Sequence, residues 1–311
     1  MLLLDADQVR ARLDPGALVE ALRTGLAQAE LFQVPDRVGL PIDPAAGSTL
    51  LLKPAWRRGG LLGVKVTTHH PDNGRHGLPA IHGVYVLMEA DTGRPLATMD
   101  GTELTRWRTA AASALAADHL APDTVDEHLL VGAGNVAACL PACYAAVREV
   151  GLTRVWARRP ESAAALVEQL RGEGYAAEVA PDLRAAVRSA DVVSAATSAT
   201  SPLVLGRDVR PGTHVDLVGA FTPAMVEADE ELMTTASLFV DIEAAIEAGD
   251  LAGPLARGTL VPSDVLATLA DLAAGRHTGR AGAEEVTVFT SVGTSLEDHV
   301  AATLVLGRDG G

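Results

Sequence analysis

The sequence predicts an α/β protein of two domains, in which a domain built on a parallel sheet is inserted into an α+β domain. Three observations support this prediction. Extended apolar runs dominate the first 120 residues, apolar runs alternate with helical stretches from residue 121 onward, and an amphipathic stretch ends the chain. Such alternation is typical of βαβ units and a parallel sheet. The length of 311 residues fits two domains, at roughly 150 residues each.

The composition is that of a folded, aliphatic and acidic chain. Apolar residues make up 48% of the sequence, charged residues 21% and aromatic residues 3%, which excludes wholesale disorder and requires an aliphatic core. The net charge of −15 argues against a general nucleic-acid or anionic membrane surface. A small anionic substrate is still compatible with this charge, because a pocket can carry a local positive field.

Cysteine and lysine usage exclude several kinds of site. Cys139 and Cys143 form neither a disulfide framework nor a CxxC metal motif, which favours a reducing compartment. The opening apolar run is cut by Asp5, and no run approaches a membrane span, so we expect a soluble cytoplasmic protein. Only two of the 25 basic residues are lysines, Lys53 and Lys65, and neither follows a glycine as in a Walker A loop.

The first domain is expected to combine helices with an antiparallel sheet. Residues 15–32 place three leucines on one helical stripe, and residues 102–120 form a second helical stretch. A turn at 90–93, with Asp91 and Gly93, joins the last two predicted strands into a hairpin. The predicted strands are 48–53, 61–68, 80–89 and 94–99.

The second domain begins where the texture changes at residue 121. A final helix at about 295–306 is expected to return to the first domain. We therefore predict a first domain of residues 1–120 plus 291–311 and a second domain of residues 121–290. The predicted strands are 128–132, 153–157, 176–179, 191–196, 213–219, 236–241 and 286–290, and the predicted helices are 135–149 (with a kink at Pro141), 161–172 and 182–189.

A glycine-rich loop follows the first strand of this second domain. The segment HLLVGAGNVA, residues 128–137, contains the pattern G-x-G-x-x-A between a strand and a helix, as in the dinucleotide-binding Rossmann fold. Gly132 would allow the tight turn, Gly134 the approach of the pyrophosphate, and Ala137 close helix packing. The alternative is a structural glycine turn. The candidate cofactor contacts in this loop are Gly132, Ala133, Gly134, Asn135 and Val136.

Two arginines follow the second strand of the same domain. NAD sites usually carry an acidic residue near this point, to bind the ribose 2′-hydroxyl. The sequence has Arg158 and Arg159 instead, and a guanidinium can pair with a 2′-phosphate. We therefore predict NADP(H) in preference to NAD(H). The alternative is a pair of solvated arginines at the start of a helix.

Several polar residues of the first domain are candidates for a site. Arg108 shares a helical stripe with Leu104 and Leu115, so it points inward and either binds an anion or forms an internal salt bridge. Alternation along its strand favours a solvent-facing Lys65 when that strand is taken alone, and Arg37 is uninformative by itself.

Histidines of the first domain do not indicate a metal. His82 shares a strand face with Val84 and Val86, where a lone histidine is more often a hydrogen-bonded core residue than a catalyst. His69 and His70 are adjacent, and adjacent strand residues point to opposite faces, so we expect no metal site.

Five segments together resemble the ornithine cyclodeaminase/mu-crystallin family. They are residues 63–73 (GVKVTTHHPDN), 77–117 (from GLPAIHG to TRWRTAAASALAA), 129–137 (LLVGAGNVA), 213–229 (THVDLVGAFTPAMVEAD) and 288–302 (VFTSVGTSLEDHVAA). The resemblance implies a homodimeric enzyme with a Rossmann domain inserted into a substrate-binding and dimerisation domain. In such dimers the substrate-domain sheets pack together across the two-fold axis.

The resemblance also assigns substrate contacts. It implies that Arg37, Lys65 and Arg108 hold a substrate carboxylate, which turns Lys65 toward the cleft. Phe221 stands after the turn Val218-Gly219-Ala220, where ornithine cyclodeaminases carry an Asp for the side-chain amine. The absence of this carboxylate favours an apolar or cyclic substrate. The segments LPAIHG and VGAFTPAMVEAD look most like the imine reductases of the family.

These features together predict NAD(P)H-dependent reduction of Δ1-pyrroline-2-carboxylate or Δ1-piperideine-2-carboxylate to L-proline or L-pipecolate. The nicotinamide is expected near Thr197, Ser198, Val292 and Gly293, which follow later strands of the sheet. His82 is the candidate proton donor, with Lys65 or solvent as rivals. Ornithine cyclodeamination, alanine-type dehydrogenation and non-catalytic NADPH binding by a crystallin-like protein remain as alternatives.

Overall fold

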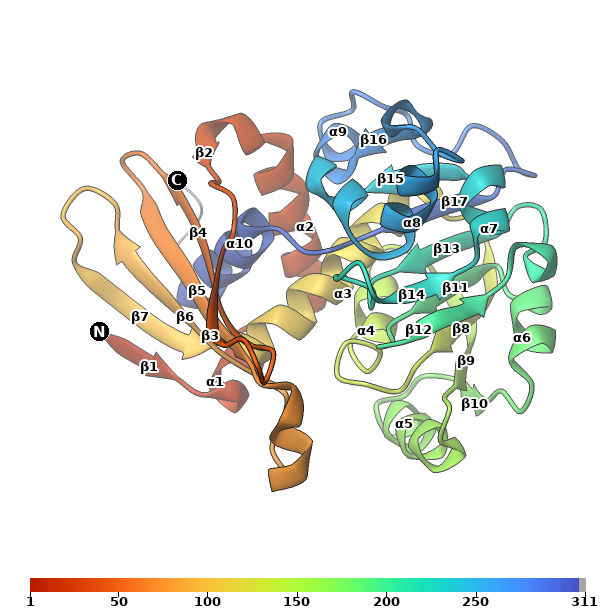
Figure 1. Ribbon diagram of the computed structural model, residues 1–311, viewed down its shortest axis with the longest axis horizontal. Helices are drawn as coiled ribbons and strands as arrows, with labels where there is room; N and C mark the ends of the chain where they lie inside the picture. Colours follow the sequence, from red (N-terminus) through yellow and green to blue (C-terminus); the bar gives the residue numbers. More distant parts are fainter. Residues whose placement is uncertain (308–311) are drawn as a thin grey trace. The chain divides into compact units, whose positions relative to one another are not determined.

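Residues 1–307 are described in the computed structural model of the chain, and they fall into two units (Figure 1). Of the described residues, one unit comprises Met1–Arg108 and residues 294–307, and the other comprises Thr109–Gly293. The first division therefore lies inside helix α3 (Gly101–Leu120) rather than after it. The reason is that the end of α3 bonds within the second unit, where Arg280 Nε donates to the Leu120 carbonyl at 2.7 Å. Residues 308–311 of the predicted first domain lie outside the described part.

The first unit is built on a seven-stranded sheet with the order β1-β7-β6-β5-β4-β2, and β3 also pairs with β4. All pairings are antiparallel except that of β1 with β7. Strands β4 to β7 occupy the four predicted segments, whereas β1 to β3 were not predicted. The strands are β1 (Leu2–Leu4), β2 (Phe32–Gln33), β3 (Val38–Asp43), β4 (Ser48–Arg57), β5 (Leu61–His69), β6 (Ile81–Glu89) and β7 (Pro95–Asp100).

Strand β4 is longer than predicted because it continues through Pro54. Proline has no N–H to donate and is normally confined to the edge of a sheet. Strand β3 pairs with β4 as far as Leu52, and β2 pairs with it again from Trp56. Pro54 lies between these two pairings, so its missing N–H leaves no ladder bond unmade on that side.

Helix α10 (Ser295–Leu306) packs on β4 and β5 of this sheet, and helix α2 (Pro15–Ala27) packs against α10 (Figure 1). Asp14 caps α2, and the helix ends five residues before the predicted end at residue 32. A Cβ at Gly25 would lie 2.5 Å from Val300 Cγ2, so glycine permits the close approach of the two helices. The short elements of this unit are α1 (Ala6–Arg10), η1 (Ala29–Leu31) and η2 (Pro71–His76).

The second unit is a doubly wound parallel sheet, as the alternation of runs predicts. Its eight strands have the order β10-β9-β8-β11-β13-β17-β15-β16. They are β8 (Val125–Val131), β9 (Val150–Trp156), β10 (Ala177–Val179), β11 (Val192–Ala195), β13 (His214–Leu217), β15 (Ser237–Val240), β16 (Val265–Thr268) and β17 (Thr287–Thr290). Strands β12 (Thr200–Val204) and β14 (Val226–Ala228) form a separate pair.

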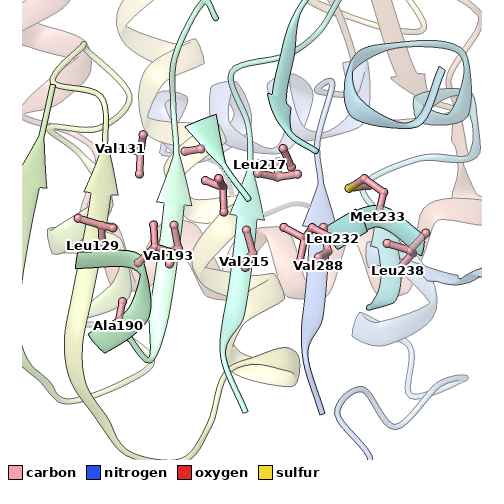
Figure 2. Close-up of a cluster of buried hydrophobic side chains, with 14 of the residues drawn as sticks. Leu129, Val131, Ala190, Val193, Val215, Leu217, Leu232, Met233, Leu238 and Val288 are labelled. Atoms are coloured by element: carbon pink, nitrogen blue, oxygen red, sulfur yellow. The ribbon is translucent and has the colours of Figure 1, made fainter. Parts of the chain in front are cut away.

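Short helices connect these strands, and aliphatic side chains fill the core. Figure 2 shows Leu129, Val193, Val215 and Val288 side by side on four neighbouring strands, and all four are fully buried. The helical elements are α4 (Leu140–Tyr144), α5 (Pro160–Gly172), α6 (Leu183–Ser189), η3 (Gly206–Asp208), α7 (Glu230–Thr235), η4 (Glu243–Glu247), α8 (Gly249–Arg257), η5 (Pro262–Asp264) and α9 (Leu269–Ala273).

The predicted helix at 135–149 is wrong in extent, because only α4 is regular there. Pro141 has no N–H, so the helical bond to the Ala137 carbonyl cannot form. The chain instead makes tighter turns before α4, with Cys139 N–H donating to the Val136 carbonyl at 2.9 Å. The proline thus interrupts the helix rather than kinking it.

Cys139 and Cys143 are both buried, and neither forms a disulfide. Within residues 1–307, no helix combines the length and the apolar character that crossing a membrane requires.

Candidate active site

Both lysines of the chain and one arginine form a basic cluster in the first unit. Lys53 on β4 lies directly opposite Lys65 on β5, so both side chains leave the same face of the sheet. Arg108 approaches from α3, and none of the three residues is more than 9% exposed. Like charges directly opposite each other on a sheet repel, and buried cations require counter-charges. The basic cluster of Lys53, Lys65 and Arg108 therefore needs anions beside it.

Two carboxylates at the start of α10 supply these counter-charges. Lys65 Nζ donates to Asp298 Oδ1 at 2.8 Å, and Arg108 Nε donates to the same oxygen at 3.0 Å. Lys53 Nζ lies 3.9 Å from Asp298 Oδ2. Arg108 Nη1 also donates to Glu297 Oε2 at 2.8 Å. The Asp298 carboxylate thus lies within ion-pair distance of every member of the basic cluster.

The pKa values of Asp298 and Lys65 reflect this arrangement. Burial alone would raise the pKa of the Asp298 carboxyl, but Lys65, Arg108 and Lys53 outweigh burial and lower it to about 2. Burial is the largest influence on Lys65 and lowers its pKa to about 7, because Asp298 offsets only part of that effect. Near neutral pH, Lys65 can therefore both carry and release a proton, whereas Asp298 stays ionised.

The structure decides between the alternatives for Lys65 and Arg108. Lys65 is only 5% exposed, so the solvent-facing strand lysine is wrong. Arg108 points inward, as its helical stripe predicts, and it makes internal salt bridges to Asp298 and Glu297. Both side chains are therefore held by carboxylates of the protein itself.

Arg37 and His82 are exposed, unlike the three members of the buried cluster. Arg37 is exposed and directly precedes β3. His82 is also exposed and pairs with Thr68, whereas Lys65 pairs with Tyr85. Successive side chains of a strand alternate between faces, so His82 and Lys65 lie on opposite faces of the sheet. The structure therefore does not bring His82 to Lys65, and no hydrogen-bonded core position for His82 is observed.

Sequence reasoning missed Lys53, Glu297 and Asp298 as site residues. One signal for Lys53 was present, because arginine occupies 23 of the 25 basic positions and both remaining lysines lie in this cluster. The two carboxylates gave no such signal, since acidic residues near the start of a helix are common for electrostatic reasons.

In the second unit, the glycine loop after β8 has a geometry that fits a dinucleotide. Gly132 has φ of 114°, and a Cβ there would lie 2.7 Å from the Ala196 carbonyl oxygen, so the fold itself requires this glycine. A Cβ at Gly134 would meet no atom of the described residues within 4 Å. The protein does not require that glycine for packing, and its bare backbone leaves room for a pyrophosphate.

A buried carboxylate holds the loop after β11. Glu227 accepts hydrogen bonds from the Thr197 N–H at 2.7 Å, the Thr197 hydroxyl at 2.8 Å and the Gly219 N–H at 2.7 Å. Burial raises the pKa of Glu227 to about 8, although these hydrogen bonds lower it. A Cβ at Gly219 would lie 2.1 Å from the Thr197 carbonyl oxygen, so only glycine fits. Thr197 is thereby fixed, and the exposed Ser198 follows it.

A second buried carboxylate holds the loop after β17 in the same way. Asp241 Oδ2 accepts hydrogen bonds from the Ser291 hydroxyl at 2.9 Å, the Val292 N–H at 2.9 Å and the Gly293 N–H at 2.5 Å. Strands β11 and β17 flank β13, so both loops leave the carboxyl edge of the sheet, where doubly wound folds collect ligands. Glu227 and Asp241 therefore fix the positions of the two loops through these hydrogen bonds.

Arg158 and Arg159 lie just after β9, which neighbours the strand that leads into the glycine loop. Both are exposed, and Arg159 occupies the position before α5. Within residues 1–307 neither guanidinium has an ion-pair partner. They are thus available to an anion next to the carboxyl edge of the sheet.

Phe221 belongs to the second unit, unlike the other predicted substrate contacts. It is half-buried in the loop between β13 and β14. Arg37, Lys65 and Arg108 all belong to the first unit. The predicted site residues are thus divided between a basic cluster in one unit and loops at the carboxyl edge of the sheet in the other.

Known proteins are similar to this one over nearly the full chain. A Delta(1)-pyrroline-2-carboxylate reductase of Paracoccus denitrificans is 41% identical over 293 residues, covering 92% of this chain and 90% of that protein. The structure of Thermococcus litoralis Delta(1)-pyrroline-2-carboxylate reductase in complex with NADH and L-proline has a TM-score of 0.93 at 28% identity, covering 99% of this chain and 97% of that chain.

An archaeal alanine dehydrogenase dimer with bound NAD has a TM-score of 0.92 at 29% identity, covering 99% of this chain and 95% of that chain. The sequence model of the ornithine cyclodeaminase/mu-crystallin family matches residues 1–309. This match, the level of identity and the shared architecture agree, and the chain belongs to the ornithine cyclodeaminase/mu-crystallin family.

Proposed function

We propose that this protein is an NAD(P)H-dependent imine reductase acting on Δ1-pyrroline-2-carboxylate or Δ1-piperideine-2-carboxylate. The products are L-proline or L-pipecolate. The observation that carries the proposal is the buried basic cluster, in which three cations face two carboxylates. Its excess positive charge matches one substrate carboxylate, and relatives at 31–41% identity are Delta(1)-pyrroline-2-carboxylate reductases.

The basic cluster binds and orients the carboxylate. Arg108 offers a planar guanidinium and Lys65 a point charge, which together hold an α-carboxylate in one orientation. Arg37 adds an exposed positive charge at the start of β3. Most of the rate enhancement comes from presenting the C=N carbon in one fixed geometry.

The second unit holds the cofactor. Gly132, Ala133, Gly134, Asn135 and Val136 receive the pyrophosphate, and Thr197, Ser198, Val292 and Gly293 line the nicotinamide. A bound reduced nicotinamide supplies the hydride. Arg158 and Arg159 favour NADP(H) over NAD(H), since their guanidinium groups can pair with a 2′-phosphate. Phe221 replaces the carboxylate that a diamine would need and suits an apolar ring.

Lys65 holds the proton for the imine nitrogen. A protonated imine accepts hydride more readily, and a donor with a pKa near the working pH is the most effective. The pKa of Lys65, about 7, meets this condition. His82 lies on the other face of the sheet, so we assign it no role in proton transfer.

The other face of this sheet supports a homodimer. Val38, Leu40, Ile42 and Val84 are all exposed there or at the adjoining β3. A contiguous exposed apolar patch marks a contact surface, and one relative is an alanine dehydrogenase dimer. We propose that two copies pair through this sheet.

NADPH oxidation with the two cyclic imines tests the proposal. Loss of nicotinamide absorbance without added ammonia, with either imine, supports imine reduction. The resemblance to an alanine dehydrogenase favours a second candidate, which would turn over pyruvate only when ammonia is present. Turnover of pyruvate with ammonia but of neither imine would replace the first proposal with the second. Ammonia release from L-ornithine would indicate the lyase of the family.

A further inference from the structure

We infer that Asp298 is the positioning residue of the basic cluster, and that it limits the cluster to substrates with one carboxylate. This inference rests on the proposed function, since it names the charge class of ligand for the same site. Asp298 is fully buried on α10 and lies 2.8 Å from Lys65 and 3.0 Å from Arg108. Lys53 lies 3.9 Å away, on the strand beside that of Lys65.

The geometry explains how three cations can be buried together. Lys53 and Lys65 are directly opposite each other, and Arg108 shares the same space, so their mutual repulsion would drive the side chains apart. A single carboxylate within ion-pair distance of all three offsets part of that repulsion. Asp298 therefore fixes where Lys65 and Arg108 point before any substrate arrives, which spares the substrate the cost of ordering them.

The charge balance sets the class of ligand. Among these five side chains, the three cations exceed the carboxylates of Asp298 and Glu297 by one charge when Lys65 is protonated. One added carboxylate neutralises the cluster, whereas a second would leave an excess negative charge in a buried site, which is costly. Arg37 lies outside the cluster and is exposed, so solvent screens its charge.

Asp298 also governs the protonation of Lys65. The charged and titratable groups around Lys65 are Asp298, Arg108 and Lys53, with Tyr85 opposite it on β6. Tyr85 contacts His299 Nδ1 at 3.4 Å, and burial raises the pKa of this tyrosine, so it stays neutral. Of these groups only Asp298 favours the charged lysine. Its removal leaves burial and two cations, which favour the neutral amine, and the hydrogen bond from Lys65 Nζ to the neutral Thr105 hydroxyl at 3.1 Å.

Selective lysine labelling provides a direct test, because the whole chain contains only Lys53 and Lys65. The full-length protein with ¹³Cε-labelled lysine should show two side-chain signals, assigned with the Lys53→Arg variant. We expect Asp298→Asn to lower the pKa of Lys65 by about one unit or more, as loss of an adjacent opposite charge does. An unchanged pKa of Lys65 would overturn the inference.

A matched pair of ligands tests the charge limit. L-Proline and pyrrolidine-2,5-dicarboxylate differ by one carboxylate, and their dissociation constants can be compared by calorimetry with oxidised dinucleotide present. The wild type should prefer L-proline. At a pH below the pKa of Lys65 in both proteins, where the lysine stays charged, Asp298→Asn has one more net positive charge and should reduce that preference about tenfold or more, which corresponds to about 1.4 kcal/mol. Asp298→Glu should restore it. An unaltered preference in Asp298→Asn would contradict the assignment.

Two readouts separate the possible failures. Dinucleotide affinity reports folding of the second unit, and the circular dichroism spectrum reports the fold as a whole. If Asp298→Asn does not fold, the less disruptive Asp298→Glu variant still tests the inference through the pKa of Lys65, which should remain near the wild-type value. If the wild type folds but reduces no imine, the proposed function fails, while the lysine signals still decide whether Asp298 controls Lys65.

Discussion

The Lys65 ammonium lies 2.8 Å from the Asp298 carboxylate, although 233 residues separate the two in the sequence. Lys65 is on the central strand β5, and Asp298 is in the first turn of the last helix. The chain must therefore pass through the whole second unit before it returns to complete the basic cluster. The C-terminal helix is thus as much a part of the first unit as its strands are.

Replacing only one residue of the Arg108–Glu297 ion pair should destabilise the protein. Arg108→Met removes the salt bridge from Arg108 Nη1 to the buried Glu297 carboxylate, and breaking a buried pair from one side typically costs about 3–5 kcal/mol. The double variant Arg108→Met/Glu297→Gln should recover part of the loss, because it removes both charges. Urea denaturation of the wild type, both single variants and the double variant measures the coupling. Strictly additive losses would show that the two residues do not interact.

Substrate affinity should fall as the pH rises through about 7. Lys65 binds a carboxylate in its charged form, and burial lowers its pKa to about 7, so the charged form predominates below that pH and is lost above it. We expect kcat/KM for the cyclic imine to decline on the alkaline side. Lys65→Arg should lower kcat, because arginine does not release a proton in this range. It keeps its charge throughout, so the remaining activity should show a flatter decline, while any limb due to the imine itself remains. Identical pH profiles for the two proteins would exclude Lys65 as the titrating group.

A methyl group at Gly134 should weaken dinucleotide binding without unfolding the protein. No described atom lies within 4 Å of a Cβ at this position, so Gly134→Ala has room in the folded chain. The same Cβ would project into the space proposed for the pyrophosphate, and we expect a loss of about tenfold or more in NADPH affinity, roughly 1.4 kcal/mol. Fluorescence titration measures this affinity. Gly282→Ala, equally unhindered, is the matched control and should bind normally.

Gly132→Ala should behave differently from Gly134→Ala. Its φ of 114° and the 2.7 Å approach of a Cβ to the Ala196 carbonyl oxygen both oppose a side chain. We expect a loss of about 1–3 kcal/mol in the free energy of unfolding, in addition to weaker dinucleotide binding. Thermal unfolding of the two variants side by side provides the measurement. Equal melting temperatures for both would contradict the structural role given to Gly132.

Removal of Arg158 and Arg159 should change cofactor preference rather than general affinity. If these guanidinium groups bind the 2′-phosphate, Arg158→Ala/Arg159→Ala should raise the KM for NADPH by about tenfold or more and leave that for NADH nearly unchanged. Arg171, an exposed arginine of α5 paired with Glu168, provides a control position. A parallel rise in both KM values would mean that the arginines do not read the phosphate.

Local sequence patterns predicted much of the fold for physical reasons that are themselves local. The parallel strands of the second unit are continuous apolar runs, because a doubly wound sheet is covered on both faces. The predicted 161–172 and 182–189 agree closely with α5 and α6. The prediction of a helix at 135–149 was wrong because Pro141 removes one backbone hydrogen bond. Whether a helix survives that loss depends on the turns around it, which the local pattern does not reveal.

The sequence by itself determined the two-part architecture, the glycine loop with its arginines, and the family, because these depend on residue types at short spacings. Tertiary structure alone decided which side chains meet. Strand register put Lys53 opposite Lys65 and sent His82 to the other face, and the return of α10 brought Asp298 to both lysines. Such contacts join strands and helices far apart in the chain, and no local pattern encodes the register or the packing that creates them.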